Sequence, residues 1–450
     1  MGGANLRRMN PAIFSTMLVT SGSALISLIN FATMVLLMHQ FTPGDFGKIS
    51  ILLTIMTVLP VLMDFGTTPS VLRFGPMLEE SGLIEKKSQV YRVILRIRIQ
   101  VGLIAFVLVS LSSAYLAQLL LHDAGQWLFI VLAAAGAIAS SFSQYVSTLF
   151  QASERFVDMM IVRIIDAFLK IVLISGLLIV RLSVSPEWIV VIYAGAPMLA
   201  LLIMIPRLDR TSIVGQIDPG MTRKIIRLSF WYMISSINIM IFMNFDLFIL
   251  AILKSSEEVG FFNSGYRIAS LLYLAVNAIF AVLMPRISRK LTDRDLIAFL
   301  IRASRFCLLA TVMLIPMVFS GAFLFDLLNL ENYKPAIPIY YLTAADHLTM
   351  VLFAPIMLLL FAVNRPKLMA GLTGIEMALN VIGDLLTVPK YGAVGAAATT
   401  LIIRFCISLL TAAIFFLDFR TRKRLLSDMT WIRKIPDTDP NESILYPPDS

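Results

Sequence analysis

The residues of this chain best suited to bind a charged ligand are basic side chains inside or at the end of long apolar segments. They are Lys170, Arg267, Arg404 and Arg73. An arginine guanidinium stays protonated and can donate two hydrogen bonds to one phosphate or carboxylate group. A charge at the centre of a membrane segment costs about 2.5–3.5 kcal/mol on insertion scales, so these side chains should face protein or water. The pattern therefore indicates a binding site for an anionic group.

Arg404 is the strongest of the four candidates, because no acidic residue lies one turn away on its own segment. Lys170 follows Asp166 by four residues, a spacing that favours an ion pair on one face of a helix. Arg73 lies near the end of its segment, where a long basic side chain can reach lipid headgroups instead.

Arg267 also has an alternative role in a purely structural contact. Asp246 and Arg267 lie on successive apolar segments, at similar distances from the connection between them. An ion pair between these two segments is therefore the alternative to ligand binding by Arg267.

Carboxylates inside apolar segments are the second group of candidate functional residues, since they are the usual sites at which H+ or Na+ is carried within a membrane. The candidates are Asp64, Asp246, Glu376 and Asp384. His347 could also change its charge near neutral pH, but its neighbour Asp346 favours a satisfied pair in the core. We predict no catalytic group, metal site or other cofactor, because the sequence has no HExxH, CxxC, GxSxG or GxxxxGK[ST] array.

Twelve apolar segments must position these residues. A helix that crosses a bilayer needs about 20 mostly apolar residues, and this chain is 58% hydrophobic and only 14% charged. This composition excludes a soluble domain and predicts an all-α membrane protein with about 12 transmembrane helices. The segments span 13–38, 47–72, 94–117, 126–150, 160–180, 187–206, 228–252, 260–284, 299–325, 336–362, 368–388 and 393–418. Pro60 and Pro69 fall inside the second segment and predict a bend there.

Most of the 37 Lys and Arg residues lie at the two ends of the chain and on alternate connections. Under the positive-inside rule, both termini are then cytoplasmic and the protein crosses the plasma (inner) membrane many times. The basic residues on the opposite connections are few: Lys48, Arg181, Lys254, Lys334 and Lys390. The net charge of +9 thus reflects topology and attraction to anionic lipids, rather than binding to nucleic acid.

The basic connection 207–227 contains proline and glycine and divides the chain into two sets of six segments. We therefore expect an N-terminal half at 1–206, a cytoplasmic linker at 207–227 and a C-terminal half at 228–419. Residues 420–450 have little apolar content and are predicted to form a disordered cytoplasmic tail.

The two sets of segments show signs of duplication. Asp45 matches Glu258 and Gly47 matches Gly260, each pair 213 positions apart. Six crossings bring both copies into the membrane in the same orientation, so the repeats are parallel and related by a pseudo-two-fold axis along the membrane normal. Folds of this kind place their substrate between the halves.

The order and spacing of several stretches resemble one known family along residues 10–420. These stretches are FTPGDFGKIS at 41–50, DFGTTPSVLRF at 64–74, FQASERF at 150–156, FDLFILAILKSSEEVGFFNSGYRIAS at 245–270 and VPKYGAVGAAATTLI at 388–402. The pattern resembles the polysaccharide-transport branch of the multidrug/oligosaccharidyl-lipid/polysaccharide exporter superfamily, the O-antigen-type oligosaccharide flippases.

This resemblance implies an alternating-access flippase rather than an enzyme. Its substrate would be an undecaprenyl-pyrophosphate-linked oligosaccharide, moved from the cytoplasmic to the outer leaflet for synthesis of O-antigen, exopolysaccharide or another cell-surface polymer. The expected partners are this lipid-linked substrate, the bilayer and the polysaccharide polymerase machinery.

Two other classes remain open on the residues alone. A cation-coupled multidrug or small-molecule exporter of the same superfamily would share the fold, although basic residues inside the segments would repel cationic drugs. A polymerase or ligase of the same pathways would be an enzyme, and such chains resemble proteins with a large outer loop, which these short connections do not provide.

Overall fold

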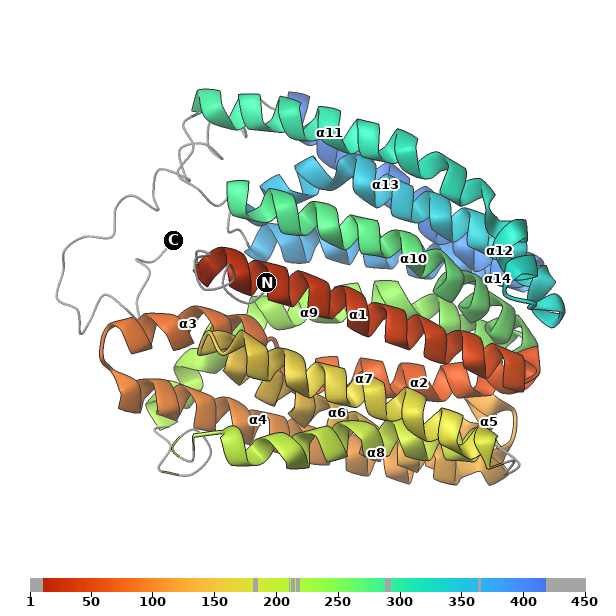
Figure 1. The fold of residues 1–450 in the computed structure, drawn as a ribbon, viewed down its shortest axis with the longest axis horizontal. Helices are drawn as coiled ribbons and strands as arrows, with labels where there is room; N and C mark the ends of the chain where they lie inside the picture. The colour runs from red at the N-terminus through yellow and green to blue at the C-terminus, as the bar shows by residue number, and fades with distance from the viewer. Residues whose placement is uncertain are drawn as a thin grey trace, which may run out of the picture.

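The computed structural model describes residues 11–180, 185–209, 211, 215, 219–287, 293–362 and 366–417. Within these residues the regular structure is helical, and most of the helices run side by side along one direction (Figure 1). The first part of the chain forms α1 (Pro11–Gln40), α2 (Pro43–Asp64), α3 (Thr68–Glu80), α4 (Ile84–Leu111), α5 (Ser113–Leu121), α6 (Trp127–Ala152), α7 (Phe156–Ile179) and α8 (Pro186–Met204). The second part forms α9 (Pro219–Leu253), α10 (Ser256–Ile287), α11 (Asp293–Phe319), α12 (Gly321–Leu327), the short 3-10 helix η5 (Glu331–Ala336), α13 (Ile337–Ala362) and α14 (Pro366–Leu417).

The helices confirm an all-α membrane protein with the expected number of crossings. Nine segments of the described chain are long and apolar enough to cross a bilayer, with mean hydropathy from 1.2 to 2.4. Neither α7 nor α10 is among the nine, although both run alongside the others (Figure 1). α14 counts once but doubles back at Gly392, whose backbone is not helical. With α7, α10 and both limbs of α14 included, the bundle has the twelve crossings that the apolar pattern predicts.

The predicted second segment, 47–72, is not one continuous helix. α2 ends at Asp64, Phe65 and Gly66 adopt positive φ angles of 51° and 66°, and α3 starts at Thr68. The residue before Pro69 is disfavoured in a helix, and Pro69 itself fits the first turn of a new one. The bend predicted from the prolines is therefore a complete break, after which α3 continues as a separate helix.

The two halves meet where α2 and α10 begin, at the right-hand end of the bundle in Figure 1. A Cβ atom on Gly47 of α2 would overlap the carbonyl oxygen of Ser256, at the start of α10. A Cβ atom on Gly260 of α10 would overlap the carbonyl oxygen of Pro43, at the start of α2. Pro43 and Ser256 are themselves 213 positions apart, as Gly47 and Gly260 are. Reciprocal contacts of this kind are what a two-fold axis produces.

A second pair of reciprocal contacts surrounds the glycines. The hydroxyl of Tyr333 donates to the carbonyl oxygen of Phe41 at 2.9 Å. On the other side of the axis, Nε2 of His122 lies 2.9 Å from the carbonyl oxygen of Lys254, which is 213 positions after Phe41. The duplication seen in the sequence is therefore present as a pseudo-two-fold contact that joins the halves at this end of the bundle, called the far end below.

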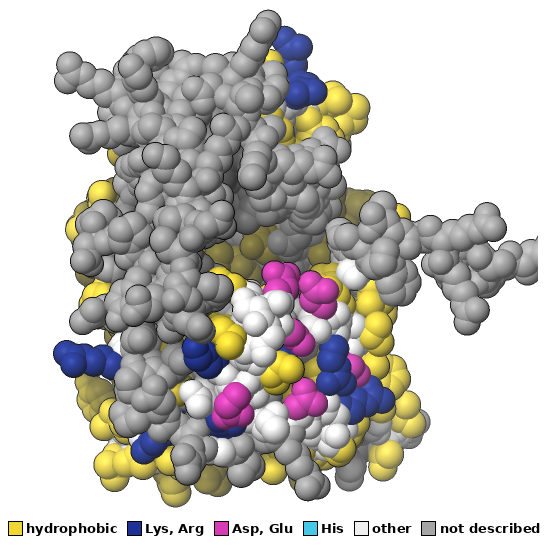
Figure 2. All heavy atoms as spheres, turned by 90° about the vertical axis from the view of Figure 1, so that its left-hand side faces the viewer, with side chains coloured by type: hydrophobic (Ala, Val, Ile, Leu, Met, Phe, Trp, Pro, Cys, Tyr) yellow, Lys and Arg dark blue, Asp and Glu magenta, His cyan; other side chains and the backbone are white. Residues whose placement is uncertain are grey.

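The opposite end, where α1 begins and α14 ends, is called the basic end because the basic connections lie there. Lysine, arginine, aspartate and glutamate side chains gather on this face, with hydrophobic side chains around them (Figure 2). The described charges include the ion pairs Lys87–Glu79 at 2.8 Å and Arg92–Glu85 at 2.6 Å. The expected linker 207–227 is partly helical, because α9 already begins at Pro219, and its residues 210, 212–214 and 216–218 lie outside the described residues. The expected tail, 420–450, lies outside them entirely.

Candidate functional site

A cavity of about 510 Å³ lies between the halves, with walls from α2, α9, α10, α13 and α14. It begins at Thr54, about two turns after Gly47 on α2, and at Phe262, two residues after Gly260 on α10, and it extends toward the basic end. The face at that end is hollowed near its centre (Figure 2). Among the described residues, the N-terminal half contributes only Thr54, Thr57 and Val61 to the lining, and the charged lining groups belong to the C-terminal half.

Arg267 lies on the α10 wall of this cavity. Its Nε donates to Oδ1 of Asn263, one turn earlier on the same helix, at 3.2 Å. Among the described residues it has no carboxylate partner, and the expected ion pair with Asp246 is wrong, because Asp246 bonds to α14 instead. Arg267 is therefore a cavity cation whose charge no described neighbour neutralises.

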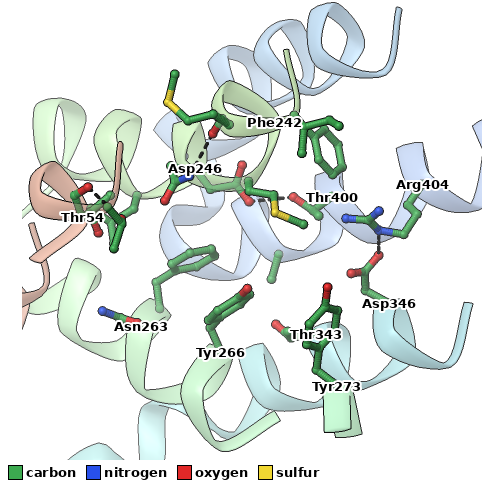
Figure 3. A pocket seen from close by; sticks show the side chains of 18 of the residues that line it. Thr54, Phe242, Asp246, Asn263, Tyr266, Tyr273, Thr343, Asp346, Thr400 and Arg404 are labelled. Atoms are coloured by element: carbon green, nitrogen blue, oxygen red, sulfur yellow. Dashed lines mark hydrogen bonds and ion pairs between the residues drawn. The ribbon is translucent and has the colours of Figure 1, made fainter. Parts of the chain in front are cut away.

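Arg404 also lines the cavity, but it is neutralised by two carboxylates from other helices. Its Nε donates to Oδ1 of Asp346 on α13 at 2.5 Å (Figure 3). Its Nη1 lies 3.6 Å from Oε1 of Glu376. Its guanidinium also stands over the ring of Phe242, 4.7 Å from the centroid. Arg404 has no acidic residue one turn away on its own segment, but carboxylates from elsewhere neutralise its charge. Asp346 therefore pairs with Arg404 rather than with His347.

A buried carboxylate cluster joins α9 to α14. The Thr400 hydroxyl donates to Oδ2 of Asp246 at 2.6 Å, and Nδ2 of Asn380 donates to Thr400 at 3.2 Å. The carboxyl groups of Asp246 and Asp384 are within hydrogen-bonding reach of each other. Four buried acceptor oxygens have no donor in the described chain: Oδ1 of Asp246, Oδ1 of Asn380 and both carboxylate oxygens of Asp384. The sequence candidates Asp246 and Asp384 are thus brought together.

Asp64, in contrast, is fully engaged in the N-terminal half. It forms an ion pair with Arg98 of α4 and accepts hydrogen bonds from the hydroxyls of Thr67 and Thr68 at 3.2 and 2.7 Å. Arg98 also donates to the carbonyl oxygen of Ser141 at 3.0 Å and is 1% exposed. This pair ties the break between α2 and α3 to α4 and α6, and it is not part of the cavity lining. Arg98 lies inside the predicted third segment, 94–117, and was not among the candidate residues, because its partner Asp64 is 34 residues away in the sequence.

Lys170 is not among the residues that line the cavity. Nζ of Lys170 lies 2.7 Å from Oδ2 of Asp166, which confirms the ion pair expected from their spacing, and it also stands 5.1 Å from the ring centroid of Tyr193. Arg73 belongs to α3, but its side chain lies outside what the structure describes.

Aromatic residues of the cavity are the main group that sequence reasoning overlooked. Tyr266 and Tyr273 of α10 flank His347 of α13, with ring centroids 6.2 and 5.5 Å from the imidazole. Asn263, Tyr266, Arg267 and Tyr273 share one helical face through their spacings of three, four and seven residues. This polar and aromatic stripe in an apolar segment was the signal that could have identified the wall.

The chain resembles known proteins in both sequence and fold. The profile of the family described as "Polysaccharide biosynthesis protein" matches residues 13–290. No curated sequence is significantly similar to the chain.

Three solved structures illustrate the likeness in fold. The lipid II flippase MurJ in an inward closed conformation has a TM-score of 0.67 at 14% identity, covering 94% of each chain. A multidrug resistance MATE family transporter of the MOP superfamily, in an inward-facing conformation, has a TM-score of 0.61 at 15% identity, covering 89% of this chain and 95% of the other. A point mutant of the Vibrio cholerae MATE transporter VcmN has a TM-score of 0.56 at 15% identity, covering 91% of this chain and 95% of the other.

The structures with this fold are transporters and a flippase, and the matched profile covers more than half of the chain. Two six-helix halves, a pseudo-two-fold contact and a cavity between the halves agree with that fold. The chain therefore belongs to the polysaccharide biosynthesis protein family, and it is a multi-pass membrane protein with the fold seen in the MATE transporters and in MurJ.

Proposed function

We propose that the protein is a flippase that moves a lipid-linked oligosaccharide, carried on undecaprenyl pyrophosphate, from the cytoplasmic to the outer leaflet. The observation that carries the proposal is Arg267, a cation without a described carboxylate partner in the wall of a cavity between the halves. A diphosphate would neutralise this charge through paired N–H···O bonds. Membership of a polysaccharide biosynthesis family supports a sugar-bearing substrate.

In this proposal the basic end faces the cytoplasm, as the positive-inside rule predicts. The contacts between Gly47, Gly260 and their opposite carbonyls then close the cavity toward the outside. The substrate would enter from the cytoplasmic leaflet and leave after the halves separate at the far end. The isoprenoid tail would remain in the bilayer, and the surface polymer would be assembled by separate polymerase machinery.

The carboxylates of Asp246 and Asp384 are our proposed coupling site for H+ or Na+. Two buried carboxylates with unsatisfied oxygens are costly without a proton or a cation between them. The amide oxygen of Asn380 adds a neutral ligand, and oxygen ligands suit a hard cation. Asp246 lines the cavity, so an ion can reach the cluster from the same space as the substrate.

α14 connects the proposed ion site to the substrate cavity. Glu376, Asn380 and Asp384 follow one face of its first limb at intervals of four residues, while Thr400 and Arg404 are one turn apart on its second limb. Binding of a cation at Asp246 and Asp384 would fix Thr400 and with it the position of Arg404. This arrangement offers a direct route from ion binding to the cavity wall.

Export of a cationic small molecule is the second candidate. Arg404 is paired with both Asp346 and Glu376, so this group of three side chains contains two carboxylates and one cation. A volume of about 510 Å³ also falls within the range of small-molecule sites. An organic cation could therefore bind beside Asp346, in which case Arg267 would oppose its binding.

The test compares Arg267→Gln and Arg267→Lys with Lys390→Gln, which removes one exposed charge at the far end. Each purified variant is reconstituted in vesicles with a fluorescent isoprenyl diphosphate oligosaccharide, and transfer between leaflets is measured with an impermeant quencher. We expect loss of transfer for Arg267→Gln, partial transfer for Arg267→Lys, and wild-type transfer for Lys390→Gln.

The same variants are introduced into cells that lack the gene. The proposal predicts that Arg267→Gln cells accumulate lipid-linked oligosaccharide and lose surface polysaccharide. Normal amounts of lipid-linked oligosaccharide and of surface polysaccharide in these cells, together with new sensitivity to cationic drugs, would favour the exporter instead.

A further inference from the structure

One wall of the cavity has an aromatic surface combined with unused hydrogen-bonding groups. Tyr266 and Tyr273 are seven residues apart on α10, or about 10 Å along the helix, and His347 of α13 lies between their rings. The hydroxyls of both tyrosines point into the cavity, beside Thr343 (Figure 3). The wall formed by Tyr266, Tyr273, His347 and Thr343 is called the aromatic wall below.

The polar atoms of the aromatic wall lack partners in the described chain. Nδ1 of His347 is buried without a hydrogen bond, and the residue is only 4% exposed. The hydroxyls of Tyr266 and Tyr273 have no hydrogen-bond partner among the described residues either. A buried imidazole nitrogen normally finds a partner, whereas the tyrosines are open to the cavity, Tyr266 being 37% exposed. Such a set of groups around a cavity is therefore available to a ligand.

The aromatic wall does not itself carry an unpaired charge. Asp346, next to His347 in the chain, is taken up by Arg404 at 2.5 Å. The cavity cation without a described carboxylate partner is Arg267, which directly follows Tyr266 and lies on the same side of α10. A ligand that fits both features has an anionic group for Arg267 and, joined to it, an uncharged ring rich in hydroxyl groups.

We propose that the aromatic wall is a subsite for the first sugar ring of the substrate, attached to the diphosphate that Arg267 binds. A sugar ring has apolar C–H faces that can pack on the tyrosine rings, and its edge carries hydroxyls that can pair with the Tyr266 and Tyr273 hydroxyls and with Nδ1 of His347. The subsite rests on the flippase proposal. It names the residues that would distinguish a lipid diphosphate carrying a sugar from one without a sugar. Hydroxyl-specific contacts of this type discriminate strongly, because the unliganded groups are left unsatisfied when the hydroxyls are missing.

The test measures binding to full-length protein in nanodiscs with two short-chain probes. One probe is an isoprenyl diphosphate, and the other is the same lipid carrying a single hexose on the diphosphate. The variant Tyr266→Phe/Tyr273→Phe removes both hydroxyls but keeps the rings. Tyr391→Phe, at an exposed tyrosine of the far end, is the matched control.

We expect the wild type and Tyr391→Phe to bind the hexose-bearing lipid about tenfold more tightly than the bare lipid, as two satisfied hydrogen bonds would provide. The double variant should lose this preference and keep its affinity for the bare lipid. Arg267→Gln should weaken binding of both probes and keep the ratio between them. His347→Phe should reduce the preference in the same direction as the double variant.

Three results would overturn the inference in different ways. Equal binding of both lipids by the wild type would refute the sugar subsite and leave the flippase proposal standing. Failure of the wild type to bind either lipid would refute both. If a quaternary ammonium dye binds instead, and more weakly to variants with Tyr266→Ala or Tyr273→Ala, the aromatic wall serves a cation through its ring faces.

Discussion

Gly47 and Gly260 occupy equivalent positions in the two halves, and each packs against the backbone that begins the other's helix. Gly47 lies against the carbonyl of Ser256, and Gly260 against the carbonyl of Pro43. The contact is isologous, so any motion that separates one pair separates the other. Both positions exclude a side chain, which allows α2 and α10 to approach each other far more closely than helices with larger residues.

Replacement of either glycine by alanine should therefore prevent closure of the far end. The test places a single cysteine at Thr57 in the cavity, after Cys307 and Cys406 have been replaced, and labels intact cells with an impermeant maleimide. Thr57→Cys alone should label slowly, and Gly47→Ala or Gly260→Ala should increase the labelling at least several-fold.

Gly195→Ala is the control for these variants, because a Cβ atom there would meet no other atom within 4 Å. Labelling of Thr57→Cys should not change in this background. Equal labelling in all four proteins would mean that the glycine contacts do not seal the cavity.

The sequence allowed the fold to be predicted because its main signals are local or periodic. Apolar length predicted the crossings, and the 213-residue repeat of Asp45 and Gly47 predicted the relation between the halves. The break at Gly66 was harder to predict, since Pro60, inside α2, does not end its helix while Pro69 begins a new one. The difference depends on the close approach of Gly66 to the backbone of Met233 in α9, which is a tertiary contact.

The candidate site was predictable only in part, for the same reason. The pair of Asp166 and Lys170 is four residues apart and was correctly expected. Arg404 and Asp346 are 58 residues apart, and Thr400 and Asp246 are 154 apart. No spacing rule connects such residues, so their choice of partner depends on how the helices pack.

Loss of Arg98 should destabilise the protein much more than loss of Lys170. Arg98 is almost completely buried, so Arg98→Met leaves the Asp64 carboxylate without its cation, at a cost of about 3–5 kcal/mol. The side chains of Lys170 and Asp166 are 14% and 25% exposed, and Lys170→Met should cost clearly less. Thermal unfolding in the same detergent would measure the difference. An unfolding temperature of Arg98→Met equal to that of Lys170→Met would contradict the structural role assigned to the Asp64 pair.

Arg404 should be coupled energetically to Asp346. Arg404→Gln leaves the carboxylates of Asp346 and Glu376 near each other with no cation between them, and should lower the unfolding temperature. Asp346→Asn in that background removes one of the two charges and should restore part of the loss. A double-mutant cycle should give a coupling energy of about 0.5–3 kcal/mol for residues in direct contact. Additive effects of the two substitutions would show that the observed ion pair contributes no coupling.

The carboxylates of Asp246 and Asp384 should be needed for coupling but not for binding of the lipid. Asp384→Asn removes one carboxylate while it preserves the size of the side chain, so the site should no longer hold a proton or Na+ as the native pair would. In vesicles, transfer of the lipid-linked substrate should then become insensitive to an imposed Na+ or proton gradient. The affinity of the variant for the bare isoprenyl diphosphate should stay within about threefold, or about 0.6 kcal/mol, of wild type.

Glu257→Gln, at an exposed acid of the far end, should keep the full response to the gradient. A gradient response in Asp384→Asn equal to that of Glu257→Gln would move the coupling ion elsewhere, and Glu376, beside Arg404, would be the next residue to test.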